Sequence, residues 1–209
     1  MAQTVSVDQV TLYDLEQRFG LRQVESGGFF PEWQAELPKL TDAEQQRLAR
    51  VEAAVANLEH RSVLENTVKL AVIAPLLDLA GLFLPPFYVT TEKTVDIEAA
   101  DNSLTVRGRL DILVLQDRLW VMVIESKRAE FSLKVGIPQV LSYMLAAPER
   151  RQPLYGLVTH GTDFIFLKLD HAGPNYARSH QFVLGQNAGL ARVLQIMKHL
   201  AAAISPIEG

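Results

Sequence analysis

Cysteine is absent from the 209 residues of this chain, and its absence removes several classes of function at once. Without a thiol the protein has no disulfide framework, no cysteine nucleophile and no zinc or iron–sulfur centre with cysteine ligands. Long apolar runs are absent too: the longest, from Leu70 to Leu77, ends at Asp78 and falls far short of the roughly 20 residues that span a bilayer. The N-terminal residues lack the pattern of a secretory signal, so we expect a cytoplasmic protein with no membrane segment.

The chain also lacks a surplus of basic residues. The chain has 20 Lys and Arg residues against 24 Asp and Glu residues, a formal net charge of −4, which argues against a nucleic-acid partner. The average hides an asymmetry, because residues 1–125 hold 11 basic and 19 acidic residues whereas residues 126–209 hold 9 basic and 5 acidic residues. The basic surplus therefore begins where the most informative motif of the sequence ends.

The sequence is that of a globular α/β protein, with 48% hydrophobic and 21% charged residues. Capping boxes at Thr41–Glu44 and Ser62–Glu65 begin two helices, the second of which should kink or restart at Pro75. Five runs rich in Val, Thr, Ile and Leu predict strands, over 87–98, 104–115, 119–127, 154–159 and 164–169. Helices are expected over 137–146, with Pro138 in the first turn, and over 190–203. We expect one domain over 41–209, with residues 1–40 as an extension over its core.

Three charged residues interrupt two strands that are otherwise apolar. Asp111 lies in the second predicted strand, and Glu125 and Lys127 end the third. An isolated buried charge costs several kcal/mol, roughly, so these residues must meet one another, a metal ion or solvent. A single cluster that contains all three residues would give each of them a partner.

Strand geometry decides whether that cluster forms. Glu125 and Lys127 are two residues apart and share a face of the sheet. A three-residue loop over 116–118 would place Asp111 opposite Val123 and on the same face as Glu125. A loop with an even number of residues would place Asp111 on the other face.

The chemistry of such a cluster is that of phosphodiester hydrolysis. Two carboxylates and the backbone carbonyl of Ser126 are hard oxygen donors that suit Mg²⁺ or Mn²⁺. Lys127 cannot bind a metal while charged, but it can orient an attacking water and stabilise negative charge. The alternative is an ordinary Glu–Lys ion pair at the end of a strand.

The order of these residues resembles a known superfamily. Glu125-Ser126-Lys127-Arg128 after an apolar strand, with Gly108-Arg109-Leu110-Asp111 before it, resembles the PD-(D/E)xK nucleases. The sequence is most similar to the N-terminal nuclease domain of type I restriction enzyme R subunits. Gln139 and Tyr143 match that group's Q-x-x-x-Y motif, and Glu65 matches the glutamate of its first helix, whereas Leu110 replaces the signature proline. The resemblance implies a restriction-endonuclease-like fold with a mixed central sheet of four or five strands flanked by helices.

The resemblance also implies roles for single residues. The catalytic set is Asp111, Glu125, Lys127 and Gln139; the metal ligands are Glu65, Asp111, Glu125 and the Ser126 carbonyl; the nucleic-acid contacts are Arg109, Arg128, Lys134 and Tyr143. Several of these side chains also fit a purely structural role. Glu65 fits a helix cap, Gln139 and Tyr143 fit a buried hydrogen-bonded pair, and Arg107 fits a solvated strand face. His160 is expected in a surface turn.

The sequence therefore predicts a Mg²⁺- or Mn²⁺-dependent endonuclease that cleaves DNA. Helicase motor domains and a G-x-x-x-x-G-K-[ST] phosphate loop are missing, so a partner protein would supply specificity or translocation. Cleavage of both strands needs two sites, and hence a homodimer or a second strike. The alternative is a non-catalytic nucleic-acid-binding or protein-interaction subunit that retains the nuclease fold.

Overall fold

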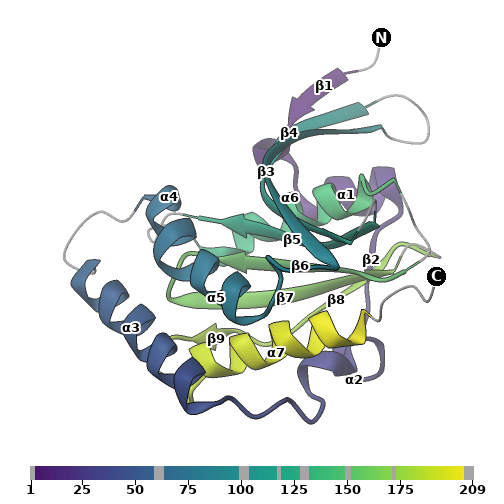
Figure 1. Ribbon diagram of the computed structural model, residues 1–209. Helices are drawn as coiled ribbons and strands as arrows, with labels where there is room; N and C mark the ends of the chain where they lie inside the picture. The colour runs from purple at the N-terminus through teal and green to yellow at the C-terminus, as the bar shows by residue number, and fades with distance from the viewer. Residues whose placement is uncertain are drawn as a thin grey trace.

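The protein is described by a computed structural model that covers residues 3–58, 64–98, 104–116, 119–127, 132–148, 152–170 and 173–204. Within these residues the chain forms a mixed α/β fold, with one sheet of nine strands flanked by helices (Figure 1). The strands are β1 Gln3–Ser6, β2 Arg22–Gln23, β3 Phe87–Glu98, β4 Leu104–Gln116, β5 Leu119–Ser126, β6 Leu154–Thr159, β7 Asp163–Asp170, β8 Asn175–Arg178 and β9 Phe182–Val183. The α/β class is as predicted.

The helices lie singly or in groups between these strands along the chain. They are η1 Val7–Gln9, α1 Leu12–Phe19, α2 Ser26–Phe29, η2 Pro31–Trp33, α3 Asp42–Leu58, α4 Glu65–Val68, η3 Lys69–Ile73, α5 Ala74–Leu79, α6 Leu133–Leu145 and α7 Gly189–Ala203. The capping box at Thr41 is confirmed, because Thr41 N donates to Glu44 Oε2 at 2.7 Å and Glu44 N donates to Thr41 Oγ1 at 3.3 Å. The box expected from Ser62 lies partly outside the described residues. No helix in the described ranges is long and apolar enough to cross a membrane.

The expectation of a sheet with four or five strands is wrong. The five predicted strands are β3 to β7, and the structure adds β1, β2, β8 and β9, which have two to four residues each. Strands this short contain too few residues for an alternation of apolar and polar side chains to be visible. The main path of the sheet runs β1-β4-β5-β6-β7-β8-β2, with β3 paired to β4 and β9 paired to β7.

The first forty residues contribute two strands to the sheet, in addition to covering its core. β1 pairs with β4 in parallel, and β2 pairs with β8 in parallel, so this segment supplies both ends of the main strand path. After β2, the Glu32 carboxylate accepts hydrogen bonds from Tyr155 Oη at 2.9 Å and Lys168 Nζ at 2.5 Å. This partly buried contact fixes the N-terminal segment to β6 and β7.

The sheet has a hydrophobic core on each face. The first core is formed with α3, α5 and α7, through residues such as Val55, Leu76 and Val193. The second is formed with α1 and α6, through residues such as Leu15 and Val140. Figure 1 shows α3, α5 and α7 on one side of the strands and α1 and α6 on the other. The apolar character of β5 and β6 follows from this burial on both faces.

One of two prolines acts differently from the prediction. The helix restarts at Pro75 as predicted, because the π-helix η3 ends at Ile73 and α5 begins at Ala74 with Pro75 in its first turn. Pro138 is not in the first turn of a helix that starts near residue 137, because α6 begins at Leu133 and Pro138 lies in its interior. Ser132 caps α6 by accepting a hydrogen bond from Lys134 N at 3.3 Å.

Candidate active site

The β4–β5 hairpin places Asp111 beside Glu125, but by a route the sequence did not predict. Gln116 pairs with Leu119, so the loop has two residues and the expected three-residue loop is wrong. The register then shifts by one residue between Val114 and Leu115, which compensates for the even loop. Beyond this shift the last pair is Ile112 with Ile124, and Asp111 and Glu125 are the next residues on their strands.

Strand β4 changes the direction of its side chains at Asp111. Leu110 packs in the core beneath α6, whereas Ile112, two residues later, packs in the opposite core. In a regular strand residues two apart share a face, so the alternation slips at Asp111. The neighbouring strand is irregular at the same level, where Glu92 has a φ of 57°. This local irregularity turns the Asp111 carboxylate toward the end of β5.

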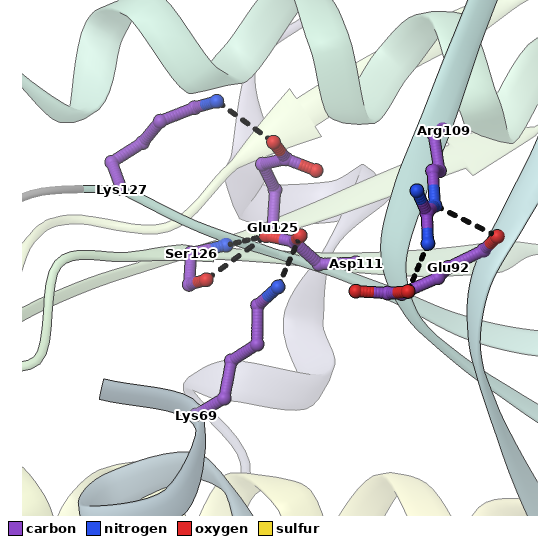
Figure 2. Close-up of polar contacts among 7 residues, drawn as sticks. All are labelled: Lys69, Glu92, Arg109, Asp111, Glu125, Ser126 and Lys127. Carbon is purple, nitrogen blue, oxygen red and sulfur yellow. Dashed lines mark hydrogen bonds and ion pairs between the residues drawn. The ribbon is translucent and has the colours of Figure 1, made fainter. Parts of the chain in front are cut away.

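The Asp111 carboxylate is held by three hydrogen bonds (Figure 2). Its Oδ2 accepts from Ser126 N at 2.8 Å and from Ser126 Oγ at 2.9 Å. Its Oδ1 accepts from Lys69 Nζ at 2.6 Å, and both side chains of this ion pair are less than one-fifth exposed. The Ser126 carbonyl stays a predicted metal ligand, and the structure shows in addition that the amide and hydroxyl of Ser126 orient Asp111.

Lys69 is the residue that sequence reasoning missed. It lies where α4 gives way to the π-helix η3, and single-turn π-helical segments are frequent at functional sites. The available signal was a lysine set between Val68 and Leu70 in an apolar helix. Only the fold shows that its ammonium group reaches Asp111, 42 residues away in the chain.

Glu125 and Lys127 form a direct ion pair at the end of β5. Lys127 Nζ donates to Glu125 Oε1 at 2.7 Å, and the two side chains of Lys127 and Glu125 are 13% and 8% exposed. The backbone amide of Lys127 donates to Thr159 O at 2.8 Å, which anchors it to β6. Glu125 Oε2 is buried and has no hydrogen-bond partner among the described residues. A buried carboxylate oxygen without a partner is costly, and it is the acceptor that a cation or a donor would satisfy.

The electrostatics of the site act on Glu125. Burial, and to a smaller extent the Asp111 carboxylate, raise the pKa of Glu125 to about 7, and Lys127 partly opposes both effects. Glu65, at the start of α4, raises the pKa of Glu125 by a smaller amount, so its charge is within electrostatic range of the site. The described structure thus brings Glu65, Asp111 and Glu125 into one electrostatic group.

The raised pKa of Glu125 predicts how stability depends on pH in the metal-free protein. Because the carboxyl holds its proton more tightly when folded, with a pKa of about 7 against an ordinary 4.5, stability falls as pH rises through this interval. We expect the Glu125→Gln variant to lack this loss, so the unfolding free energies of variant and wild type should diverge by about 3 kcal/mol between pH 4.5 and 8. Urea unfolding in EDTA at several pH values measures the difference. Parallel pH profiles would contradict the assignment.

Gln139 and Tyr143 lie on one face of α6 and are both buried. Gln139 Oε1 has no hydrogen-bond partner among the described residues. The Tyr143 hydroxyl is hydrogen-bonded to the backbone of Arg109, and burial together with the Glu125 and Asp111 charges raises its pKa. Tyr143 is only 2% exposed, so it braces β4 beside Asp111 and is not placed to touch a phosphate group.

The remaining predicted residues lie around this centre. Arg109 is exposed and forms an ion pair with Glu92, and Arg107 forms an exposed ion pair with Asp96 at 2.8 Å (Figure 2 shows the first pair). Arg128 lies outside the described residues. Lys134 is exposed in the first turn of α6. His160 is not a free surface residue: its side chain is 14% exposed and contacts Thr162 and Asp163.

The donor set at the site fits a hard divalent cation. No group of three or more His, Asp or Glu side chains in the described ranges is already gathered as a metal site. However, Asp111 and Glu125 supply carboxylate oxygens, and Glu125 Oε2 is buried without a partner among the described residues. Oxygen donors of this kind suit Mg²⁺ or Mn²⁺. The competing cation on the protein itself is Lys69, whose ammonium group occupies Asp111 Oδ1.

Comparison with known proteins gives a weak structural likeness. No family model matches the chain, and no curated protein is similar to it. A solved structure that is similar is a fragment described as a candidate HsdR subunit of a type I restriction enzyme from Vibrio vulnificus, with a TM-score of 0.42 and 18% sequence identity. The match covers 68% of this chain and 26% of that chain. A TM-score this low does not establish a common fold, so the site stands on its own geometry.

Proposed function

We propose that this chain is a metal-dependent nuclease domain of the restriction-endonuclease-like type, which hydrolyses phosphodiester bonds in DNA. The observation that carries the proposal is the meeting of Asp111, in the interior of β4, with Glu125 and Lys127 at the end of the adjacent strand β5. Three ionisable groups are largely buried there together, and one carboxylate oxygen, Glu125 Oε2, has no partner among the described residues. Clusters of this kind, with a strongly shifted pKa, are typical of active sites.

The order of elements supports the same proposal. The antiparallel strands β3, β4 and β5 are followed by α6 and then by β6, which is parallel to β5. The Glu125-Ser126-Lys127 motif ends β5, and the helix with Gln139 follows it, as in the sequence pattern that resembles PD-(D/E)xK nucleases. Ligand sites of mixed α/β sheets commonly lie beyond the carboxyl ends of parallel strands, which is where Lys127 is placed.

Each residue of the site has a separate role in hydrolysis. Bound Mg²⁺ or Mn²⁺ supplies Lewis-acid polarisation of a phosphoryl oxygen and a lowered pKa for the attacking water. Asp111 and Glu125 hold the cation through their carboxylates, and the Ser126 amide and hydroxyl fix the orientation of Asp111. The Lys127 ammonium group orients the water and stabilises the negative charge that develops on the phosphate. Gln139 lies buried on α6 as a supporting residue.

A second candidate function is a nucleic-acid-binding or protein-interaction subunit that keeps this fold without cleaving. The ion pair of Lys69 with Asp111 favours it, because each carboxylate of the site is then neutralised by a lysine. The two candidates make opposite predictions about metal binding.

Calorimetric titration of Mn²⁺ into the protein distinguishes the two candidates. For a nuclease we expect a binding heat that the Asp111→Asn variant loses, with affinity lowered at least about tenfold because one of two charged ligands is gone. Asp78→Asn, the same change at an exposed position of α5, is the matched control and should bind as the wild type does. Supercoiled, linear and single-stranded DNA are then incubated with protein and Mn²⁺. Absence of both the heat and the cleavage would rule out the nuclease and favour the second candidate.

A further inference from the structure

Three cavities adjoin one another along β8 and the segment that connects it to β9. Their volumes are about 690, 380 and 360 Å³. The first and second share Arg178, Ser179 and His180, and the second and third share His180 and Gln181. The three cavities are therefore neighbours around His180, and we call them together the His180 groove.

The His180 groove is basic although the whole chain is acidic. The charged residues that line it are Lys134, Arg178 and Arg192, with Glu25 as the one acidic member. None of the three basic residues forms an ion pair within the described residues, whereas Lys69, Lys127, Lys168 and Lys198 all do. Cations without a protein partner along a groove are the groups that phosphate oxygens bind.

Aromatic rings lie along the same groove. Trp33 lines its largest cavity, and the rings of Trp33 and His180 meet edge to face with centroids 4.6 Å apart. His180 also contacts Phe182, with ring centroids 4.2 Å apart. Burial and the nearby Arg192 lower the pKa of His180, which favours the neutral imidazole. Rings beside basic side chains are typical of sites where unpaired bases stack.

One end of the groove lies next to the candidate active site. Lys134 is in the first turn of α6, and Gly136 of the same helix packs against the Lys127 side chain. His160, also in the groove, follows Thr159, whose carbonyl accepts the hydrogen bond from Lys127 N at 2.8 Å. A chain that lies in the groove is thereby led to the end of β5, where Lys127 and Glu125 are.

We propose that the His180 groove binds an unpaired nucleic-acid strand, with phosphates at Lys134 and Arg178 and a base against Trp33 and His180. Bases in a duplex are stacked on each other and cannot reach these rings, so the groove favours single-stranded over double-stranded segments. The inference rests on the proposed function for the reaction to which the strand is delivered. Binding itself is measured without cleavage.

Tryptophan fluorescence tests the proposal directly, because the chain has only two tryptophans. In a Trp120→Phe background only Trp33 emits, and Trp120 lies elsewhere, on β5 beside Lys93. Oligo(dT) and oligo(U) of about 12 nucleotides are titrated in EDTA, which prevents cleavage. We expect saturable quenching by at least one of them, and at least about tenfold weaker binding when Arg178→Gln and Lys134→Gln are combined. Lys39→Gln, at an exposed lysine of a different cavity, should leave the binding constant unchanged.

The salt dependence and a duplex complete the experiment. Loss of two phosphate contacts should reduce the slope of log K against log salt by about 1.4. No quenching by either oligonucleotide, quenching that the double variant does not weaken, or equal quenching by a duplex of the same length would each overturn the proposal. The proposed function fails separately: quenching without Mn²⁺-dependent cleavage refutes the nuclease and keeps the groove, whereas cleavage without quenching does the reverse.

Discussion

Replacing Lys127 by methionine is expected to lower the rate of metal-dependent DNA cleavage by about a thousandfold. The substitution keeps the apolar stem, which packs against Gly136 of α6, and removes only the ammonium group. That group follows β5 directly and lies 2.7 Å from Glu125 Oε1, and no other described residue donates to this carboxylate. The initial rate of conversion of supercoiled plasmid in Mn²⁺ measures the effect.

The Lys127→Met variant should remain folded. Removing one partner of a buried ion pair usually leaves an uncompensated charge, but burial and Asp111 already raise the pKa of Glu125 to about 7, so this carboxyl can take up a proton instead. Circular dichroism and the Mn²⁺ titration heat verify that the variant is folded and still binds metal. Lys39→Met is the control for the loss of one positive charge. Undiminished cleavage by folded Lys127→Met protein would remove Lys127 from the mechanism.

The sequence predicts the central elements of this fold because they are long enough to show their periodicity. Strands β3 to β7 and helices α3, α6 and α7 each contain six or more residues, and their patterns are visible in the chain. Strands β1 and β2 have four and two residues and exist through their pairing with β4 and β8, which no local pattern encodes. Their contribution to the sheet depends on tertiary contacts and so could not be predicted from the residues.

The candidate active site likewise has a part that local sequence patterns predict and a part that depends on tertiary contacts. Glu125 and Lys127 share a face because they are two residues apart, and the structure shows their ion pair. The position of Asp111 depends on a two-residue loop, a register shift at Val114 and a slip in β4, three irregularities that compensate one another. The contribution of Lys69 depends on how the π-helix lies against the sheet. Non-local features of this kind decide which side chains meet, and periodicity carries no information about them.

Replacing Lys69 by methionine is the second change with a large expected effect. It should lower the stability of the metal-free protein, and added metal should restore most of that stability. Asp111 is 15% exposed, and its Oδ1 would lose the ammonium group that lies 2.6 Å away. Removing one partner of such a pair leaves a nearly buried charge, so we expect the unfolding free energy in EDTA to fall by about 3 kcal/mol. Urea unfolding followed by circular dichroism measures the loss. Lys39→Met, at an exposed position, should change stability little.

Addition of Mn²⁺ should then remove most of the difference in unfolding free energy between the Lys69→Met variant and the wild type. In the wild-type protein a divalent cation must displace the Lys69 ammonium from Asp111, whereas in the variant it meets an unpaired carboxylate, so it should bind the variant more tightly and stabilise it more. The Lys69→Met, Asp111→Asn double variant has neither charge, so it should be more stable in EDTA than the single variant and should gain nothing from Mn²⁺. If Mn²⁺ stabilises wild type and Lys69→Met equally, Lys69 does not compete for the metal site. If it stabilises neither, Asp111 is not a metal ligand, and the Lys69–Asp111 pair serves the stability of the fold alone.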